Sequence, residues 1–178
     1  RKKGVSPITT TDGPSGIRIM ACCSLLPNGT SLASMWNTDL AYNVYKKVGG
    51  EMKVKGSDVL LAPGMNIHRS PLCGRNFEYY SEDPFLTGKT AAAVVNGLQS
   101  EGVAACPKHF ACNNQETNRN SNDSRLSERA LREIYLRGFE ICVKESQPKN
   151  IMTSYNKING VWSHYNFDLA KTVLRNEW

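Results

Sequence analysis

Two polar stretches of this sequence contain the residue types that could recognise a ligand, Cys73–Pro84 and Lys108–Arg119. Each mixes charged, amide and aromatic side chains without helical or strand periodicity, and each directly follows an apolar run. Because loops of this composition add little to a hydrophobic core, we expect them to bind something. The ligand that suits such a density of hydrogen-bonding groups is a sugar.

Asp12 and Arg75 are the first candidates for contacts with sugar hydroxyls. The carboxylate of Asp12 can accept from two adjacent hydroxyls while Arg18, close behind it, donates. The alternative is an Asx-turn, in which Asp12 caps its own Gly-Pro loop. The planar guanidinium of Arg75 suits vicinal hydroxyls or a carboxylate. The alternative for Arg75 is an ion pair with a glutamate of its own loop.

Lys108 and His109 stand at the end of an expected strand, so we expect their side chains to point to opposite faces. One would then face the site while the other anchors the loop. The amides and carboxylate of residues 113–116, together with Arg119, match a polyhydroxylated ligand. Tyr155 ends a later strand and can offer a hydroxyl or an apolar wall to a sugar ring, or else simply seal the top of the fold.

A metal or cofactor site is not expected. Cys106, His109 and Cys112 recur every three residues, but strand geometry separates Cys106 from His109, and no second ligand pair occurs elsewhere. The sequence also shows no glycine-rich phosphate loop, no Ser-His-Asp order and no Cys-His nucleophile pair. We therefore assign neither a metal nor a cofactor to this chain.

The remaining residues alternate between strand-like and helix-like patterns. We expect short strands at 7–11, 58–63, 103–107 and 151–155. We expect helices to begin near Asn37 and Thr38, at Thr87, after Ser127 and after Asn166. The stripes predicted to face inward are Leu40, Val44, Val48 and Met52; Ala91, Val94, Val95 and Leu98; Leu131, Ile134, Tyr135, Gly138 and Cys142; and Leu169, Val173 and Leu174.

Alternating strands and helices imply an α/β fold with parallel strands and right-handed crossovers. Every polar motif follows a strand, which is how a (β/α)-barrel places its active site. A complete eightfold barrel needs roughly 250 residues, whereas about four strand–helix units are recognisable in this sequence. We therefore predict that residues 1–178 form one incomplete domain, a partial (β/α)8 barrel of the TIM type.

Composition narrows the function classes. The formal net charge is +6, but the basic residues are scattered and lack any nucleic-acid-binding signature, so no nucleic-acid partner is expected. No apolar run has the length that a bilayer requires, so no membrane association is expected either. The six cysteines lack the spacing of a disulfide scaffold, which favours a reducing compartment such as the bacterial cytoplasm.

Six segments together carry a family resemblance, in the order in which the family has them. They are Thr11–Arg18, Leu60–Arg69, Cys73–Pro84, Lys108–Arg119, Ser127–Tyr135 and Met152–Gly160. With these segments the sequence resembles glycoside hydrolase family 3, most closely its bacterial β-glucosidases. The resemblance implies an N-terminal (β/α)-barrel domain and retaining hydrolysis of terminal, non-reducing β-D-glucosyl residues. The positions that match glucosyl-contacting residues of the family are Asp12, Arg18, Arg75, Lys108, His109, Arg119 and Tyr155.

The resemblance also implies that both catalytic groups lie outside this chain. The nucleophile of the family is an Asp in a strand shortly after the Asn176–Trp178 segment, and the acid/base of this subgroup is a Glu from a later domain. A second subgroup uses a His-Asp pair after Lys-His-Phe, but residues 111–114 lack that His. We assign no catalytic residue to this chain and expect it to be inactive alone.

Two alternatives remain open from the sequence. One is a relative that acts on β-xylosides or α-arabinosides, which shares the same barrel. The other is a non-catalytic carbohydrate-binding or assembly module. In either case the expected partner is a β-glucoside or related oligosaccharide. Since an open half-barrel exposes edge strands and one face of its core, we also expect a homo-oligomer or association with the missing barrel half.

Overall fold

The computed structural model describes Gly4 and residues 6–178. Parallel strands dominate its centre, with the order β1-β2-β3 in one sheet and β4 beside β6 in another. A parallel bridge between Gly64 and Lys108 joins β4 to the segment that follows β2. The strand bounds are β1 (Thr10–Asp12), β2 (Val59–Leu61), β3 (Ala104–Ala105), β4 (Lys108–Phe110) and β6 (Met152–Thr153). The expected α/β fold with parallel strands is confirmed.

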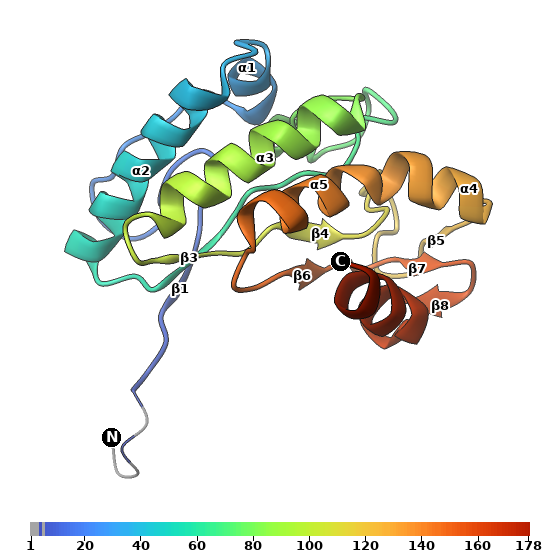
Figure 1. Cartoon of the computed structure of the whole chain (residues 1–178). Helices are drawn as coiled ribbons and strands as arrows, with labels where there is room; N and C mark the ends of the chain where they lie inside the picture. The colour runs from blue at the N-terminus through green and yellow to red at the C-terminus, as the bar shows by residue number, and fades with distance from the viewer. Residues whose placement is uncertain (1–3, 5) are drawn as a thin grey trace.

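Helices cover one side of these strands, where α2, α3 and α5 lie next to one another (Figure 1). Their bounds are α1 (Gly29–Ala33), α2 (Thr38–Lys55), α3 (Pro84–Gln99), α4 (Glu128–Ala130) and α5 (Arg137–Ser146). A π-helical stretch, Leu131–Tyr135, joins α4 to α5, and a helix at Asp168–Glu177 ends the chain. Short 3-10 turns occur at Asn76–Glu78 and Ser163–Tyr165. No helix in the described part of the chain is long and apolar enough to cross a membrane.

The predicted inward stripe of α3 is confirmed, because all four of its side chains are fully buried. The predicted stripe of α2 is wrong at its first position. Val48 and Met52 are buried, but Leu40 is 44% exposed and Ala41 and Tyr45 take the inner face. A four-residue repeat overshoots a full helical turn by about 40° at each step, so Leu40 has rotated off the buried face. Ile134 in the π-helical stretch is likewise exposed.

Side-chain caps begin the helices largely where the sequence predicted them. The side chains of Asn37, Ser127 and Asn166 accept hydrogen bonds from backbone amides of the following turn, at 2.9, 3.2 and 3.0 Å. The predicted start of α3 at Thr87 is wrong. Asp83 accepts from the Phe85 amide at 2.7 Å, and the helix begins at Pro84, since proline is well tolerated at the first helical position.

Two other expectations need correction. Asp12 is the last residue of β1 rather than part of the following turn, and Lys108 and His109 lie on β4, a strand of their own after β3. A small third sheet was not predicted, because strands of two residues carry no readable periodicity. It comprises β5 (Asp123–Ser124), β7 (Lys157–Ile158) and β8 (Val161–Trp162), with β5 parallel and β8 antiparallel to β7.

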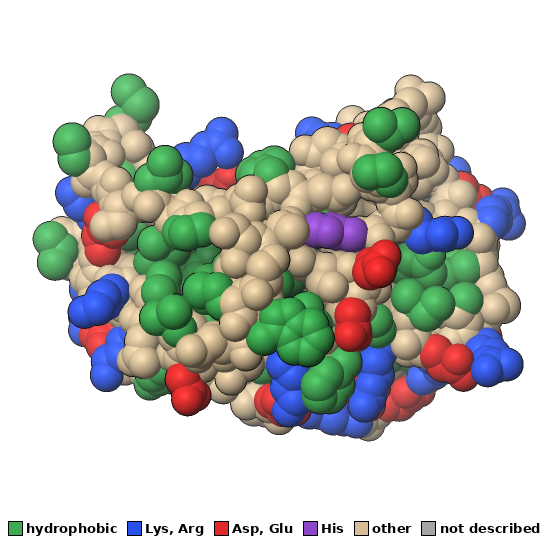
Figure 2. Space-filling model, turned by 90° about the horizontal axis from the view of Figure 1, so that it is seen from above, with side chains coloured by type: hydrophobic (Ala, Val, Ile, Leu, Met, Phe, Trp, Pro, Cys, Tyr) green, Lys and Arg blue, Asp and Glu red, His purple; other side chains and the backbone are tan. Residues whose placement is uncertain are grey.

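Charged side chains are dispersed over the face of the molecule seen from above, where basic and acidic groups lie among hydrophobic and neutral ones (Figure 2). Several basic side chains are paired with nearby carboxylates, such as Lys53 with Glu101 at 2.7 Å and Lys89 with Glu145 at 2.7 Å. This face shows no basic stripe of the kind that binds a nucleic-acid backbone.

Candidate functional site

A connected series of ion pairs lies at the carboxyl ends of β1 and β2 and around β4. The Lys108 ammonium contacts Asp12 Oδ1 at 2.8 Å and Glu78 Oε2 at 3.4 Å. The other oxygen of Glu78 lies 3.4 Å from Arg75 Nε. Asp12 Oδ2 in turn lies 3.3 Å from the exposed guanidinium of Arg18. Residues from β1, from β4 and from the loop after β2 thus meet in one place.

Glu116 extends this series toward the second polar loop. Its Oε2 lies 3.5 Å from Arg75 Nε and 2.8 Å from Arg119 Nη1, so it bridges two guanidinium groups. The Asn113 amide donates to Glu116 Oε1 at 3.2 Å. The Arg119 guanidinium lies over the Tyr155 ring, 4.8 Å from its centroid, which is a cation–π arrangement. The series therefore runs from Arg18 to Tyr155.

His109 lies buried beside the same ion pairs. Its ring contacts the Arg75 guanidinium, and its Nδ1 lies 2.9 Å from the Tyr79 hydroxyl. Burial, and then the positive charges of Arg75, Lys108 and Arg119, lower the pKa of His109 to about 2. The imidazole is therefore neutral at physiological pH, and it hydrogen-bonds within the site without adding charge.

Arg75 and Tyr79 both keep their protons, although burial shifts their pKa values in opposite directions. Burial opposes the positive charge of Arg75, but Glu78, Tyr79 and Glu116 outweigh that effect and raise its pKa. Burial, and then the negative charge of Glu78, raise the pKa of Tyr79 well above its ordinary value. Arg75 is therefore a permanent donor, and the Tyr79 phenol stays neutral.

Local backbone contacts hold these side chains in place. The Asn66 side chain pairs with both the amide and the carbonyl of His109, at 2.8 and 3.0 Å, which fixes the direction of β4. The amide of Arg18 donates to the carbonyl of Asp12 at 2.9 Å and folds the Gly-Pro turn back on β1. Glu78 ends the 3-10 turn Asn76–Glu78, where its amide donates to the Arg75 carbonyl at 3.0 Å.

A cavity of about 610 Å³ opens beside these groups. One side of it is charged and the other is apolar, including the exposed side chains of Leu25 and Phe77. The charged residues that line it are Asp12, Arg18, Arg75, Glu78, Lys108 and Glu116. Ammonium and guanidinium groups donate and carboxylates accept, so this wall can satisfy a ligand that carries several hydroxyls.

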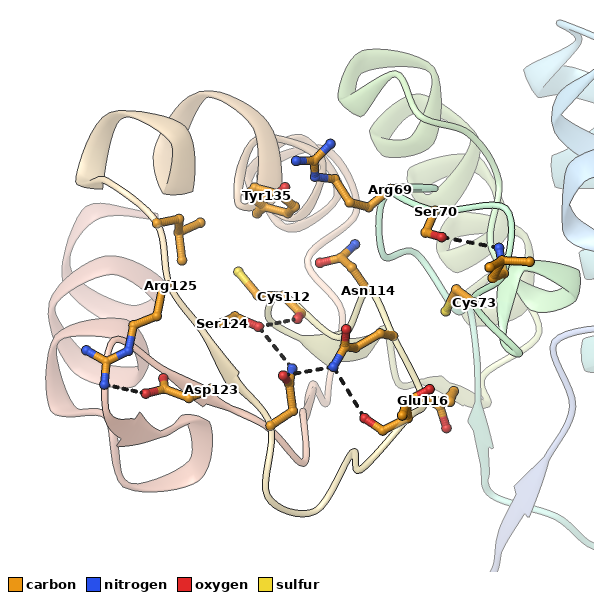
Figure 3. Close-up of a pocket in the computed structure, with 15 residues that line it drawn as sticks. Arg69, Ser70, Cys73, Cys112, Asn114, Glu116, Asp123, Ser124, Arg125 and Tyr135 are labelled. Atoms are coloured by element: carbon orange, nitrogen blue, oxygen red, sulfur yellow. Dashed lines mark hydrogen bonds and ion pairs between the residues drawn. The ribbon is translucent and has the colours of Figure 1, made fainter.

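A second cavity of about 460 Å³ lies on the other side of Glu116. Figure 3 shows Arg69, Asn114 and Tyr135 arranged around it. Polar groups of this cavity are already hydrogen-bonded within the protein; for example, the Asn114 side chain donates to the Ile67 carbonyl at 2.6 Å. Glu116, a member of the charged series, lines both cavities.

The structure connects all seven residues singled out from the sequence through side-chain contacts. Only Asp12, Arg18, Arg75 and Lys108 among them line the cavity of about 610 Å³, and Tyr155 lines a separate one. Asp12 is not an Asx-turn residue, because its carboxylate pairs with Lys108 and Arg18. Lys108 and His109 are not divided between the site and a loop anchor: both are buried, and both contact residues of the first polar loop. The described residues contain no group of three His, Cys, Asp or Glu side chains placed to hold a metal.

Four further residues of the site were not singled out individually from the sequence. Asn113 and Glu116 lie in the segment that was matched to a polyhydroxylated ligand, and the Arg75–Glu78 pair is the alternative that was given for Arg75. Glu78 and Glu116 pair with the cations, while Tyr79 and Asn113 hydrogen-bond one another at 3.2 Å behind His109. Their sequence signal was only membership of the two polar stretches. Their individual roles depend on contacts between segments that are distant in the sequence.

The chain is similar to known proteins over nearly its whole length. The model of the glycosyl hydrolase family 3 N-terminal domain matches residues 2–178. A β-glucosidase of Ruminococcus albus is 52% identical over 177 residues, which cover 98% of this chain and 19% of that enzyme. An exo-α-(1→6)-L-arabinopyranosidase of Bifidobacterium longum is 46% identical over 191 residues, covering 99% of this chain and 25% of that enzyme.

Solved structures are similar as well. β-Glucosidase 3B of Thermotoga neapolitana in complex with glucose superimposes with a TM-score of 0.97 at 54% identity, covering 98% of this chain and 26% of the enzyme. The β-glucosidase of Kluyveromyces marxianus in complex with glucose gives a TM-score of 0.97 at 44% identity, covering 99% and 22%. The chain spans about a fifth to a quarter of the length of the relatives it matches.

Proposed function

The chain belongs to glycosyl hydrolase family 3, as an N-terminal domain, and we propose that it is the sugar-binding part of a retaining β-glucosidase. The enzyme would release terminal, non-reducing β-D-glucosyl residues. The observation that carries this proposal is the paired series from Arg18 to Tyr155 beside a cavity of about 610 Å³. It supplies fixed donors and acceptors on one wall, as a sugar requires.

In this proposal the glucosyl unit contacts seven side chains. Asp12 accepts from sugar hydroxyls, and the cations donate to hydroxyl oxygens. His109, neutral because of its low pKa, exchanges a hydrogen bond without repelling the neighbouring cations. Tyr155 presents its half-exposed ring beside Arg119 as a wall for the sugar. The proposed sugar-binding residues are Asp12, Arg18, Arg75, Lys108, His109, Arg119 and Tyr155.

We propose that both catalytic carboxyl groups come from outside this chain. A retaining mechanism needs a free carboxylate to attack the anomeric carbon and a protonated carboxyl to assist the leaving group. Within the site, Asp12, Glu78 and Glu116 each contact two cations instead. Carboxylates that are each held by two cations are suited to accept hydrogen bonds. They are not suited to act as the nucleophile or as the proton donor.

We further propose that residues 1–178 form part of a (β/α)8 barrel. The parallel strands, the helices on one side of them, and the position of the charged residues at the carboxyl ends of the strands support this architecture. Half-buried side chains on the strands, such as Leu61, Ala104 and Met152, would then be covered by further strands of the barrel or by a second copy of the chain.

A second candidate activity is the hydrolysis of arabinosides or xylosides, which the 46% identity to the Bifidobacterium longum arabinopyranosidase favours. These sugars lack the hydroxymethyl group of glucose. The two activities are separated by comparing kcat/KM for nitrophenyl β-D-glucoside, β-D-xyloside and α-L-arabinopyranoside. A preference for a pentoside would replace glucoside hydrolysis as the assigned activity.

The proposed function is tested with nitrophenyl β-D-glucoside, the full-length protein that carries this chain, and the chain alone. We expect turnover with retained anomeric configuration, followed by proton NMR, from the full-length protein, and none from the chain alone. Turnover by the chain alone would contradict the placement of the catalytic carboxyls. If the full-length protein binds sugars without cleaving any of these glycosides, the chain belongs to a non-catalytic carbohydrate-binding module instead.

A further inference from the structure

We propose that Glu78 is a positioning residue, which couples Lys108 to Arg75 so that both cations face the same sugar hydroxyls. The inference rests on the proposed function, since it concerns how the sugar-binding cations are held. Glu78 itself is not proposed to bind the sugar, because each of its oxygens already contacts a cation.

The burial of the pair supports this role. The side chains of Glu78 and Lys108 are each only 5% exposed, and their charged atoms are 3.4 Å apart. Among the described residues, Arg75 and Lys108 are the only cations within ion-pair distance of Glu78. A buried charge pair without close partners is costly, so the two cations and the carboxylate hold one another in place.

The position of Glu78 itself is fixed by close backbone packing. Gly29 and Gly64 both lie against it: a Cβ on Gly64 would come within 2.9 Å of the Glu78 carbonyl oxygen and 3.2 Å of its Cγ. A Cβ on Gly29 would lie 3.0 Å from the same carbonyl group. Because the two glycines lack a Cβ, the turn that carries Glu78 packs closely against their segments. This close packing leaves the Glu78 side chain little freedom to move.

Donor counting shows what this arrangement leaves for a ligand. The Lys108 ammonium has three N–H donors. Two are directed at Asp12 and Glu78, which leaves one for a sugar hydroxyl. Arg75 uses its Nε edge for Glu78 and Glu116, which leaves its other nitrogens for His109 and a ligand. Without Glu78, both cations could turn, and the directions of the remaining donors would no longer be set.

The test combines one substitution in the protein with the removal of single hydroxyls from the ligand, and compares their effects on binding. Binding of D-glucose and of the monodeoxy-D-glucoses, each lacking one hydroxyl, is measured by competition against nitrophenyl β-D-glucoside in the full-length protein and in its Glu78→Gln variant. Glu78→Gln keeps the shape of the side chain and removes its charge. The matched control is Glu82→Gln, the same change at an exposed residue of the same loop with no ion pair in the described structure.

We expect Glu78→Gln to weaken D-glucose binding about 10- to 100-fold, the usual scale for a charged hydrogen bond. The penalty for removing one or two particular hydroxyls should shrink in that variant, because the cations that contact them are no longer aligned. The penalties for the other hydroxyls should stay as in the wild type. Glu82→Gln should leave every affinity unchanged.

Equal weakening for D-glucose and all deoxy analogues in Glu78→Gln would overturn the inference, since it would indicate a general loss of structure. If Glu78→Gln does not fold, Glu78→Asp keeps the charge and shortens the reach by one methylene. The same selective loss, smaller in size, is then expected, and a uniform loss would again refute the coupling. If the wild-type protein binds no sugar, the proposed function fails and this inference fails with it.

Discussion

Lys108 is the side chain on which the candidate site depends most, because its ammonium pairs with carboxylates from two different segments, Asp12 and Glu78. Among the described residues, Lys108 is the only cation that contacts both of these carboxylates, and replacing it removes that link. The Asp12 and Glu78 carboxylates would then repel one another, and Glu78 is buried. Stability and the proposed sugar binding are therefore linked at this residue.

We predict that Lys108→Met lowers the free energy of unfolding by about 3 kcal/mol, because it leaves buried Glu78 with one partner fewer. Urea unfolding of the wild type and variant provides the measurement. Lys171→Met is the control: Lys171 is exposed and has no ion pair in the described part of the chain, and we expect a change within about 0.5 kcal/mol. An equally small change for Lys108→Met would disprove the importance of this ammonium.

A second prediction at the residue scale concerns His109 and the pH dependence of stability. Its pKa is lowered to about 2 in the folded protein by burial and neighbouring cations, against about 6.5 when unfolded. Below pH 6.5 the unfolded chain therefore binds a proton that the folded chain does not, so stability falls as the pH falls. From this group alone the loss between about pH 7 and pH 5 is about 2 kcal/mol.

His109→Gln should flatten this dependence between about pH 5 and pH 7, a range that lies above the titration of ordinary carboxyl groups. Urea unfolding across that range measures the slope for each protein. His164→Gln, at an exposed position, serves as the control and should keep the wild-type slope. A His109→Gln slope equal to that of the wild type would show that His109 does not stay neutral in the folded protein.

At the scale of elements, the packing of α3 against α2 depends on a glycine. A Cβ on Gly97 would collide with the Tyr42 carbonyl oxygen and come within 3.0 Å of the Lys46 amide, both on α2. Gly50 on α2 has open space instead, with nothing within 4 Å of an added Cβ. The two helices therefore offer a matched pair of glycine substitutions with opposite expected signs.

We predict that Gly97→Ala destabilises the fold by about 2 kcal/mol through overpacking. Gly50→Ala should stabilise it by about 0.5–1 kcal/mol, because alanine restricts the unfolded chain and favours the helix. Thermal unfolding of the two variants beside the wild type compares the signs directly. Stabilisation by Gly97→Ala would mean that α2 and α3 do not approach as closely as described.

The elements also show what could be predicted from the sequence. Helix caps such as Asn37 and the buried stripe of α3 are local patterns, and they were predicted. The parallel order predicted that Asp12, at the carboxyl end of β1, would lie at the edge where the polar loops meet. Lys108 was expected at the end of a strand, but it begins β4. The pairing of Glu78 with Lys108, thirty residues later, depends on a turn and a bridge that leave no periodic signal.

At the scale of the whole molecule, α2, α3 and α5 cover one side of the strands (Figure 1). Side chains on the strands such as Leu61 and Met152 are half-buried. Strand edges and partly exposed apolar side chains favour association. We predict that the chain alone forms dimers or larger assemblies, measured by light scattering coupled to size exclusion. A single monomeric species across micromolar concentrations would contradict that prediction.

The central claim is that one glucosyl unit binds against the charged series in this chain. The most direct measurement is a crystal structure of the full-length protein that carries this chain, soaked with D-glucose. The account predicts sugar hydroxyls within hydrogen-bond distance of Asp12, Arg75, Lys108 and His109. Glucose bound elsewhere, with these four side chains still contacting only other side chains of the protein, would contradict the account.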